Sequence, residues 1–203
     1  MNCQVAYLAG FMDGDGCFFC NIQKRRAKSD VLIIKTGLDV SQKQSEQSQQ
    51  FIKDLISLYG GRYSEKKGKY SPIVVWRVED SDILLKLLPE LIPFLKFKKE
   101  QAQLLLEIIQ IKTGLKPFTI RSNEDILKIA SLNDTLGALK NKQPKRKWTA
   151  QRVQQFLAES YRYSEEGRED FYNKIKASSV LYGFKKGRIP KTKGTKLEAA
   201  RRK

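Results

Sequence analysis

The sequence predicts an α+β fold, in the order helix, two strands, helix, two strands and a run of helices. Strand-like segments with turn signals at their ends occur in two pairs, and apolar residues at helical spacing fill the segments between them. At 203 residues with 40% hydrophobic side chains, the chain suits one domain with a real core, or one domain with an appendage. The segment DGDG occurs in one copy, so the unit is not internally duplicated.

Each element has a local justification. The first helix is rich in small residues, and the basic loop RRAKSD joins the first two strands. Gly60-Gly61 end the second helix, Gly68-Lys69 give a hairpin signal, and Ser122 with Asp125 forms a cap-like helix start. The expected strands are residues 17–24, 31–42, 61–67 and 71–79. The expected helices are residues 4–14, 46–59, 81–88, 98–112 and 122–140, and the helix 98–112 is expected to form core behind the sheet.

The charge balance indicates a polyanionic partner. The chain carries 39 Lys and Arg against 22 Asp and Glu, a net charge of +17. Nucleic acid is the first candidate and an anionic membrane surface the second. Charged residues and prolines interrupt the longest apolar stretch, residues 83–97, so no membrane span is expected. The N-terminus MNCQVAYLAG resembles neither a signal peptide nor a transit peptide, so the protein is expected to work where it is made.

Cysteine and histidine usage restricts the chemistry. The chain has 3 cysteines and no histidine, which favours a reducing compartment and excludes mechanisms based on histidine. Cys17 and Cys20 have zinc-site spacing, but no second pair is present to complete a tetrahedral site. Hydrolytic chemistry must therefore use carboxylates, a metal ion, lysine or water.

The composition changes near residue 143. Residues 143–203 carry 17 basic and 6 acidic residues, a net +11, whereas residues 1–142 carry 22 and 16, a net +6. We expect a core over 1–142 and a basic extension over 143–203, with helices at 149–161 and 166–181 and a tail disordered in free solution. The extension is either a solvated surface or a source of non-specific DNA affinity. The basic candidates for DNA contact around its start are Lys140, Lys142, Lys145, Arg146 and Lys147.

Three interpretations compete for the DGDG segment. It could end a helix with solvated acids, although acids at a helix C-terminus are disfavoured by the dipole. A calcium loop is excluded, because residues 13–24 end in Lys24 where a glutamate is required. In the third interpretation, Ala6, Gly10 and Gly14 leave one helix face bare for close packing against a second copy. Two Asp15 carboxylates would then meet at a two-fold axis and, with Mg²⁺, form a phosphodiesterase site.

The segment LAGFMDGDG, residues 8–16, resembles the LAGLIDADG motif of homing endonucleases. The single copy is similar to the homodimeric branch that organellar introns of green algae encode. The αββαββα order and the segment PFLKFKKEQA, residues 93–102, also agree with this family. The resemblance covers roughly residues 5–142.

The resemblance implies a saddle-shaped, four-stranded antiparallel sheet that lies in the major groove of double-stranded DNA. It implies a homodimeric endonuclease that depends on Mg²⁺. The enzyme is expected to make a double-strand break with short 3′ overhangs in a long pseudo-palindromic site, and this break promotes intron mobility. Mn²⁺ is expected to substitute, and Ca²⁺ to bind without supporting cleavage. An organelle-encoded protein is expected, in a chloroplast before a mitochondrion. An intron RNA maturase and a non-cleaving DNA-binding regulator remain alternatives on this scaffold, with intron RNA as a possible partner.

The resemblance also assigns site residues. Asp15 would bind metal with help from the Gly14 carbonyl, and Gln42 would organise water. Lys98 would lie beside the scissile phosphate. Asp13 would cap or support the interface helices rather than bind metal, so it joins Ala6, Gly10 and Gly14 in the expected dimer interface. Glu46 departs from the family, because relatives often carry a basic residue just after the glutamine.

Base reading is expected from the exposed face of the sheet, where arginine and lysine favour guanine, amides favour adenine and acids favour cytosine. The candidates are Asn21, Gln23, Arg25, Ile33, Lys35, Asp39, Glu65, Lys67 and Arg77. Loop residues are expected to hold phosphates instead. These candidates are Arg26, Lys28, Lys66 and Lys69.

Overall fold

The computed structural model describes residues 3–26, 30–68, 71–114, 121–140 and 147–181. The chain divides into two compact units, Met1–Ser160 and Tyr161–Lys203. Both helices expected after residue 143 are present, as α6 (Ala150–Glu159) and α7 (Glu165–Leu181). Helix α6 belongs to the first unit, and α7 belongs to the second. The expected disordered tail lies outside the described residues.

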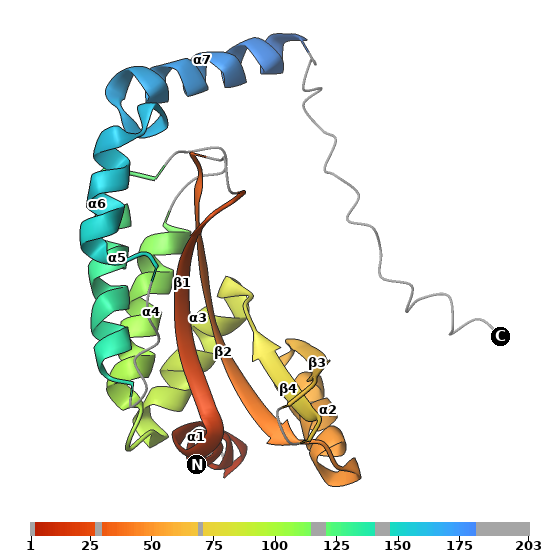
Figure 1. The fold of residues 1–203 in the computed structure, drawn as a ribbon. Helices are drawn as coiled ribbons and strands as arrows, with labels where there is room; N and C mark the ends of the chain where they lie inside the picture. Colours follow the sequence, from red (N-terminus) through yellow and green to blue (C-terminus); the bar gives the residue numbers. More distant parts are fainter. Residues whose placement is uncertain (1–2, 27–29, 69–70, 115–120, 141–146, 182–203) are drawn as a thin grey trace, which may run out of the picture. The chain divides into compact units, whose positions relative to one another are not determined.

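The first unit contains the predicted antiparallel sheet of four strands, in the spatial order β1-β2-β4-β3 (Figure 1). Its pairing places β1 at the edge, hydrogen-bonded to β2, which in turn pairs with β4. The strand bounds are β1 (Gly16–Lys24), β2 (Leu32–Lys43), β3 (Arg62–Lys66) and β4 (Ile73–Val78). The two hairpin pairs thus meet through β2 and β4 at the centre of the sheet.

The predicted order of helices is confirmed. Their bounds are α1 (Cys3–Asp15), α2 (Glu46–Tyr59), α3 (Ser81–Leu91), α4 (Lys99–Thr113) and α5 (Asn123–Ala138). Ser45 caps α2 and Asp80 caps α3 through side-chain bonds to backbone N–H groups. Gly60 and Gly61 adopt φ of 74° and 94°, which explains why glycine ends α2 and begins the turn into β3.

One helix is longer than predicted. Helix α3 was expected to end at residue 88, before Pro89, but it continues to Leu91 with Pro89 inside it. A short 3₁₀ helix, η1 (Ile92–Phe94), follows directly. Leu84, Leu87, Leu88 and Leu91 are buried along α3. Their burial offsets the hydrogen bond that the proline removes.

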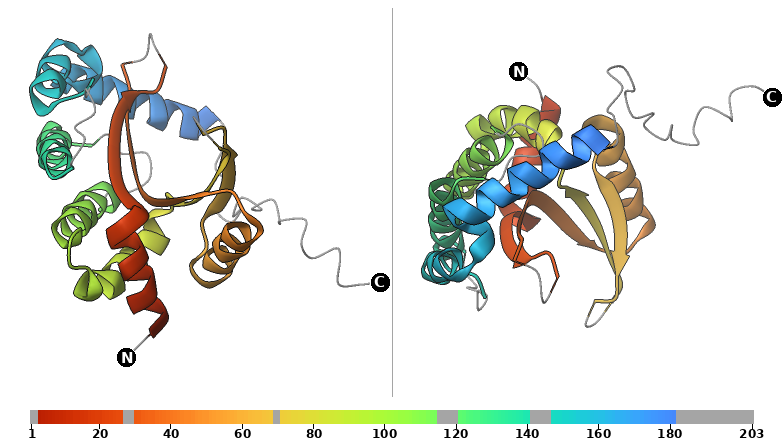
Figure 2. Two further views of the ribbon diagram at one scale, coloured as in Figure 1. Left: turned by 60° about the horizontal axis from the view of Figure 1, so that its bottom comes forward. Right: turned by 90° about the horizontal axis from the view of Figure 1, so that it is seen from above.

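The core lies between the sheet and the helices on one of its faces (Figure 2). Trp76 and Phe18 are its largest fully buried side chains, and Leu105 and Ile109 of α4 pack behind the sheet as predicted. The indole N–H of Trp76 donates to the Gly60 carbonyl at 2.8 Å, so the one polar atom of this ring is satisfied. Within the described part of the first unit, the helices pack on one face of the sheet and leave the other face available to a ligand.

The second unit is described from η2 (Tyr161–Tyr163) through α7. The Tyr161 hydroxyl donates to Asp170 at 2.8 Å, and the Arg162 guanidinium lies 4.8 Å from the centre of the Phe171 ring. These contacts join the 3₁₀ turn to the helix that follows it. Within the described part of the chain, no helix is long and apolar enough to cross a membrane.

Candidate active site and DNA interface

The C-terminal end of α1 meets the start of α4, and Asp13 makes the connection. Its carboxylate accepts hydrogen bonds from the backbone N–H groups of Lys96, Phe97 and Lys98, at 2.7, 3.2 and 2.9 Å. These N–H groups lie at or just before the start of α4, where the backbone N–H groups have no carbonyl partner inside the helix. Asp13 therefore caps α4 from α1, and its support of the interface helices of a dimer stays a prediction.

Lys98 makes the reciprocal contact. Its ammonium group donates to the carbonyls of Met12, Gly14 and Gly16 at 3.0, 2.9 and 2.7 Å, which satisfies the C-terminal end of α1. Burial lowers the pKa of Lys98 below the ordinary value of 10.5 and outweighs the opposing effect of nearby Cys17, Asp13 and Asp15. Lys98 is thus fixed in place, with its charge at the carbonyl end of α1.

Asp15 and Gln42 also lie together. The side-chain amide of Gln42, at the end of β2, donates to one carboxylate oxygen of Asp15 at 2.7 Å, and Asp15 is exposed. The structure therefore brings together all three side chains that the resemblance places at the active site. Glu46 is exposed in the first turn of α2, the helix that follows β2.

The donor set fits a hard divalent cation. Asp15 keeps a carboxylate oxygen beyond the one bonded to Gln42, and the Gly14 carbonyl oxygen has a lone pair besides the one facing Lys98. Both are oxygen ligands of the kind that Mg²⁺ and Ca²⁺ prefer. Among the described residues, no group of three or more Asp, Glu, Cys or His could hold a metal within one copy.

Removing the Asp13 carboxylate is expected to destabilise the fold. Asp13→Ala leaves three N–H groups at the start of α4 without their acceptor, so we expect the free energy of unfolding to fall by about 2–3 kcal/mol. Urea denaturation followed by circular dichroism measures this. Asp82→Ala, in the exposed first turn of α3, is the control, with an expected loss of about 0.5 kcal/mol or less. Equal losses in the two variants would contradict the capping role.

The expected dimer face of α1 is uncovered in a single chain. Gly10 and Gly14 are exposed, and among the described residues a Cβ at either position would meet no atom within 4 Å. Tyr7 is 62% exposed, and Ala6 is half-buried. The opposite side of the helix, with Val5, Leu8, Ala9 and Met12, is buried in the core. The bare stripe thus points away from its own chain.

The sheet register confirms the face expected for most of the base-reading candidates in β1, β2 and β4. Asn21 is opposite Lys35 and Gln23 is opposite Ile33, so these four side chains share the face away from the core. Asp39 of β2 is opposite Arg77 of β4 on the same face. Arg25 and Arg26 are exposed just beyond β1. Phe19 also points to this face, yet it is only 8% exposed, because the Arg77 guanidinium lies 5.1 Å from its ring centre.

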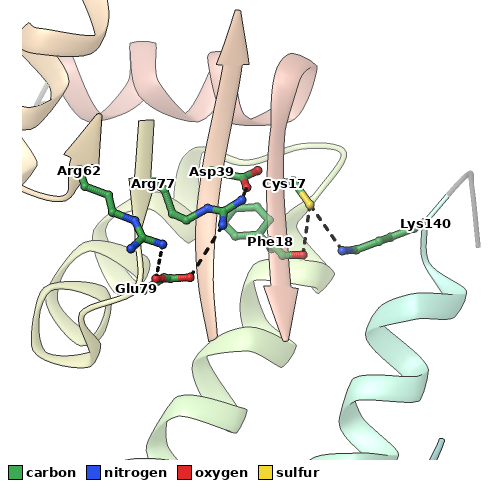
Figure 3. A network of polar contacts seen from close by, with 7 residues as sticks. All are labelled: Cys17, Phe18, Asp39, Arg62, Arg77, Glu79 and Lys140. Atoms are coloured by element: carbon green, nitrogen blue, oxygen red, sulfur yellow. Dashed lines mark hydrogen bonds and ion pairs between the residues drawn. The ribbon is translucent and has the colours of Figure 1, made fainter. Parts of the chain in front are cut away.

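Two of these candidates are bonded to each other. Arg77 donates to Asp39 at 2.6 Å and lies 3.9 Å from Glu79, which also pairs with Arg62 at 2.6 Å (Figure 3). Asp39 and Arg77 are mostly buried, with side chains 16% and 26% exposed. Sequence alternation placed them on one face, but it could not show that they neutralise each other there.

The expected face of Glu65 is wrong. Glu65 is opposite the buried Val74, and it shares the core side of the sheet with Tyr63, whose hydroxyl donates to it at 2.6 Å. Lys66, expected in a loop, is in β3 opposite Ile73, on the same face as Arg77. Lys67 follows the end of β3 and is exposed. The remaining candidates, Lys28, Lys69, Lys142, Lys145 and Arg146, lie outside the described residues.

Lys140 lies nearer to the end of α1 than its sequence position suggests. Its ammonium group lies 3.5 Å from the Cys17 sulfur, immediately after Gly16 (Figure 3). Lys147 is exposed before α6. Sequence reasoning missed the proximity of Lys140 to α1, because 123 residues separate Lys140 from Cys17.

The comparisons with known proteins agree with this geometry. The LAGLIDADG endonuclease family profile matches residues 8–109. The chain is 30% identical to the DNA endonuclease I-CreI of Chlamydomonas reinhardtii over 153 residues, which cover 75% of this chain and 88% of the relative.

Solved structures show the same fold. The homing endonuclease I-CvuI, in complex with its target in the presence of Ca, has a TM-score of 0.64 and 26% identity, over 77% of this chain and 93% of that one. I-CvuI with the I-CreI target and Mg, where the DNA is not cleaved, gives a TM-score of 0.63 and 27% identity over the same shares. The homing endonuclease I-TnaI shares the fold at 17% identity, with a TM-score of 0.57 over 78% of this chain and 99% of that one. Together with the motif on α1, these matches show that the chain belongs to the LAGLIDADG endonuclease family.

Proposed function

We propose that this protein is a metal-dependent, site-specific DNA endonuclease that acts as a homodimer and makes double-strand breaks in a long pseudo-palindromic site. The observation that carries the proposal is the cluster at the end of α1. There the exposed Asp15 carboxylate, the Gln42 amide and the Lys98 ammonium group converge in a chain of the LAGLIDADG endonuclease family. Intron homing is the biological role that we assign to this activity.

Asp15 and the Gly14 carbonyl are the groups that would hold Mg²⁺, and Mn²⁺ is expected to replace it. When bound, the metal lowers the pKa of its water and stabilises negative charge on the phosphate. Ca²⁺ is expected to support binding without cleavage. One carboxylate and one carbonyl per chain are few ligands, so we propose that a second copy supplies its own Asp15.

The protein side chains have separate tasks in hydrolysis. The Gln42 amide holds the Asp15 carboxylate in one orientation, and its carbonyl oxygen is available to a water molecule. Lys98 supplies a fixed positive charge for the charge that develops when water attacks phosphorus and the P–O bond to the leaving oxygen breaks. Asp13 fixes the backbone on which Lys98 stands.

Dimerisation through α1 follows from its bare stripe. Gly10 and Gly14 allow close approach of a second α1, with Ala6 and Asp13 beside the contact. A two-fold axis there brings two sheets to one duplex, which explains a pseudo-palindromic site.

DNA recognition is assigned to the open face of the sheet. Asn21, Gln23, Ile33 and Lys35 are proposed base contacts, and the exposed arginines and lysines beyond the strand ends are proposed phosphate contacts. The paired Asp39 and Arg77 have fewer free hydrogen-bonding groups for bases. We further propose residues 1–142 as the endonuclease core and 143–203 as a basic extension that adds DNA affinity.

We propose that the gene lies in an organelle, with the chloroplast as the first compartment to test. The match to a Chlamydomonas reinhardtii endonuclease supports this origin. Sequencing the host gene with and without its intron is the direct test.

Cleavage of a plasmid library with randomised sites tests the activity. Purified protein with Mg²⁺ is expected to produce specific double-strand cuts with short 3′ overhangs, and EDTA is expected to abolish them. Sequencing of the cut ends gives the site. Specific duplex binding without cuts would indicate a regulator, and binding confined to structured intron RNA would indicate a maturase.

The pH profile tests the role of Lys98. Because burial lowers the pKa of Lys98, its ammonium group loses its proton at a lower alkaline pH than an ordinary lysine does. Single-turnover cleavage is therefore expected to fall as the pH rises through that range. Lys98→Arg keeps its charge there and is expected to lack this fall. Because the pKa of Lys98 is lower in the folded state, the unfolded state keeps this proton up to a higher pH. The titration of Lys98 therefore raises the free energy of unfolding as pH rises, so unfolding caused by this group cannot explain a loss of cleavage at alkaline pH. Identical pH profiles of the native protein and Lys98→Arg would show that the charge of Lys98 does not contribute to the cleavage rate.

A further inference from the structure

A pair of opposite charges, Asp39 of β2 and Arg77 of β4, lies on the two central strands of the sheet, on its open face. The two residues are opposite each other in the register, and their charged groups meet at 2.6 Å. Both side chains are mostly buried. An ion pair with so little exposure adds little net stability, because the loss of hydration offsets the attraction of the charges. Stability therefore does not explain why the pair occupies this face.

An aromatic ring also holds the guanidinium group of Arg77. The ring centre of Phe19 lies 5.1 Å from this group, although β1 and β4 are separated by β2 in the sheet. The ring reaches Arg77 across Gly37 of β2, where a Cβ would lie 2.5 Å from the ring of Phe19. Gly37 thus makes room for the ring. The ring and the Asp39 carboxylate together fix the guanidinium in one orientation, so little side-chain entropy is lost when it binds a ligand.

The pair keeps one donor group and one acceptor atom for a ligand. Nη2 of Arg77 donates to one carboxylate oxygen of Asp39, whereas Nη1 lies 3.9 Å from Glu79, beyond hydrogen-bond distance. Among the described residues, neither Nη1 nor the second carboxylate oxygen of Asp39 takes part in a hydrogen bond. A donor and an acceptor therefore stand side by side on the open face.

This arrangement matches one orientation of a G·C base pair. In the major groove, guanine presents the acceptors O6 and N7, and cytosine presents the amino group on N4 as a donor. The arginine can donate to guanine while the adjacent carboxylate accepts from the cytosine of the same pair. In the reversed pair, the guanidinium would face the amino group and the carboxylate would face O6. Both contacts would then be repulsive, so the unit distinguishes G·C from C·G.

We propose that Asp39 and Arg77 act as one unit that reads a single G·C pair in each half-site, with Phe19 as the positioning residue that orients the arginine. The inference rests on the proposed function, because it assigns a base pair to one part of the same DNA surface. Asp39 lies three residues before Gln42 on β2, which is roughly 10 Å of strand, or about three base pairs of duplex. In a two-fold dimer, the other half-site carries the same pair with its orientation reversed.

The base preference at single positions tests the proposal. Each protein cuts the plasmid library with randomised sites, and sequencing of the cut ends gives the preference at every position. Selection of bound duplexes gives the same information for a protein that binds without cutting. The uncharged variant is Asp39→Asn/Arg77→Gln, and the swapped variant is Asp39→Arg/Arg77→Asp. The control, Glu107→Gln/Lys128→Gln, removes an ion pair of 3.0 Å between α4 and α5. A thermal melt shows whether each variant folds.

The native protein is expected to prefer one orientation of a G·C pair by roughly tenfold to a hundredfold at one position of each half-site. The uncharged variant is expected to lose the preference at this position and to keep it at the others, as the control does at all positions. The swapped variant is expected to prefer the reversed pair. Phe19→Leu keeps an apolar side chain at this site but removes the ring, and it is expected to weaken the preference at the same position alone.

A loss of preference spread over all positions would give the pair a structural role and overturn the inference. If the swapped variant does not fold, the uncharged variant decides, since it replaces both charges by neutral amides. If the native protein cuts the library and the variants have the same preferences as the control, the inference alone fails. If the native protein neither cuts nor binds duplex, the proposed function fails and the inference fails with it.

Discussion

Asp15→Asn is expected to abolish double-strand cleavage in Mg²⁺ while leaving the fold and duplex binding intact. Asparagine keeps the shape of the side chain but removes the negative charge that would hold a divalent cation. Asp15 is exposed and accepts one hydrogen bond from the Gln42 amide at the surface, so little folding energy depends on its charge. We expect the single-turnover rate to fall by roughly 10³-fold or more.

Quench-flow or gel measurement of cleavage, beside anisotropy of DNA binding, separates chemistry from affinity. Asp54→Asn, at an exposed position on α2, is the matched control and is expected to cut at the native rate. Retention of cleavage by Asp15→Asn would remove this residue from the metal site and leave the cluster without its central ligand.

Gly10→Leu is expected to abolish dimerisation and, with it, double-strand cleavage. A Cβ at Gly10 meets no atom within 4 Å in the described part of the chain, so the exposed surface of α1 has space for an added side chain. A closely packed partner helix could not accommodate it, because the added atoms would separate the two backbones. Leucine also favours a helix by roughly 1 kcal/mol over glycine, so stability of the monomer is expected to hold or rise.

Sedimentation equilibrium measures the association, and cleavage is assayed on the same samples. Gln4→Leu, at an exposed position one helical turn or more away on α1, is the control for added apolar surface and is expected to remain dimeric. A Gly10→Leu protein that sediments and cuts like the native one would place the dimer contact elsewhere.

The sequence predicted the architecture because its local signals are consistent. Helical apolar spacing in α2, the glycine pair after it and the alternation in β1 each point to the element that forms. The nine-residue motif placed Asp15 at a helix end, and the resemblance supplied its partners Gln42 and Lys98 from distant segments. Periodicity alone could not have paired residues that lie 27 and 84 positions apart. The structure pairs them through the contacts of Gln42 with Asp15 and of Lys98 with Gly14.

The prediction failed where the local signal was weak. In β3, RYSEK, Tyr63 is the one aromatic residue that marks the buried side, which is a weak signal, and the prediction put Glu65 on the wrong face. Glu65 lies two residues after Tyr63, so both side chains point to the core side of the sheet. The end of α3 was misplaced because Pro89 has an unfavourable local preference that four buried leucines override. The Asp13 cap and the contact between Asp39 and Arg77 depend on tertiary proximity, for which the chain carries no periodic signal.

The exchange of caps between Asp13 and Lys98 has a consequence for how the protein is made. The paired groups are 82 to 86 positions apart along the chain, so neither helix end is satisfied until the polypeptide has been synthesised past Lys98 and the intervening segment has closed. Closing such a long loop costs entropy before any contact compensates for it, which makes this junction a late event in folding. A nascent or truncated chain that ends before α4 therefore has the motif but not the junction between Asp13 and Lys98. We therefore expect the protein to become competent to cut DNA only after most of its length has left the ribosome.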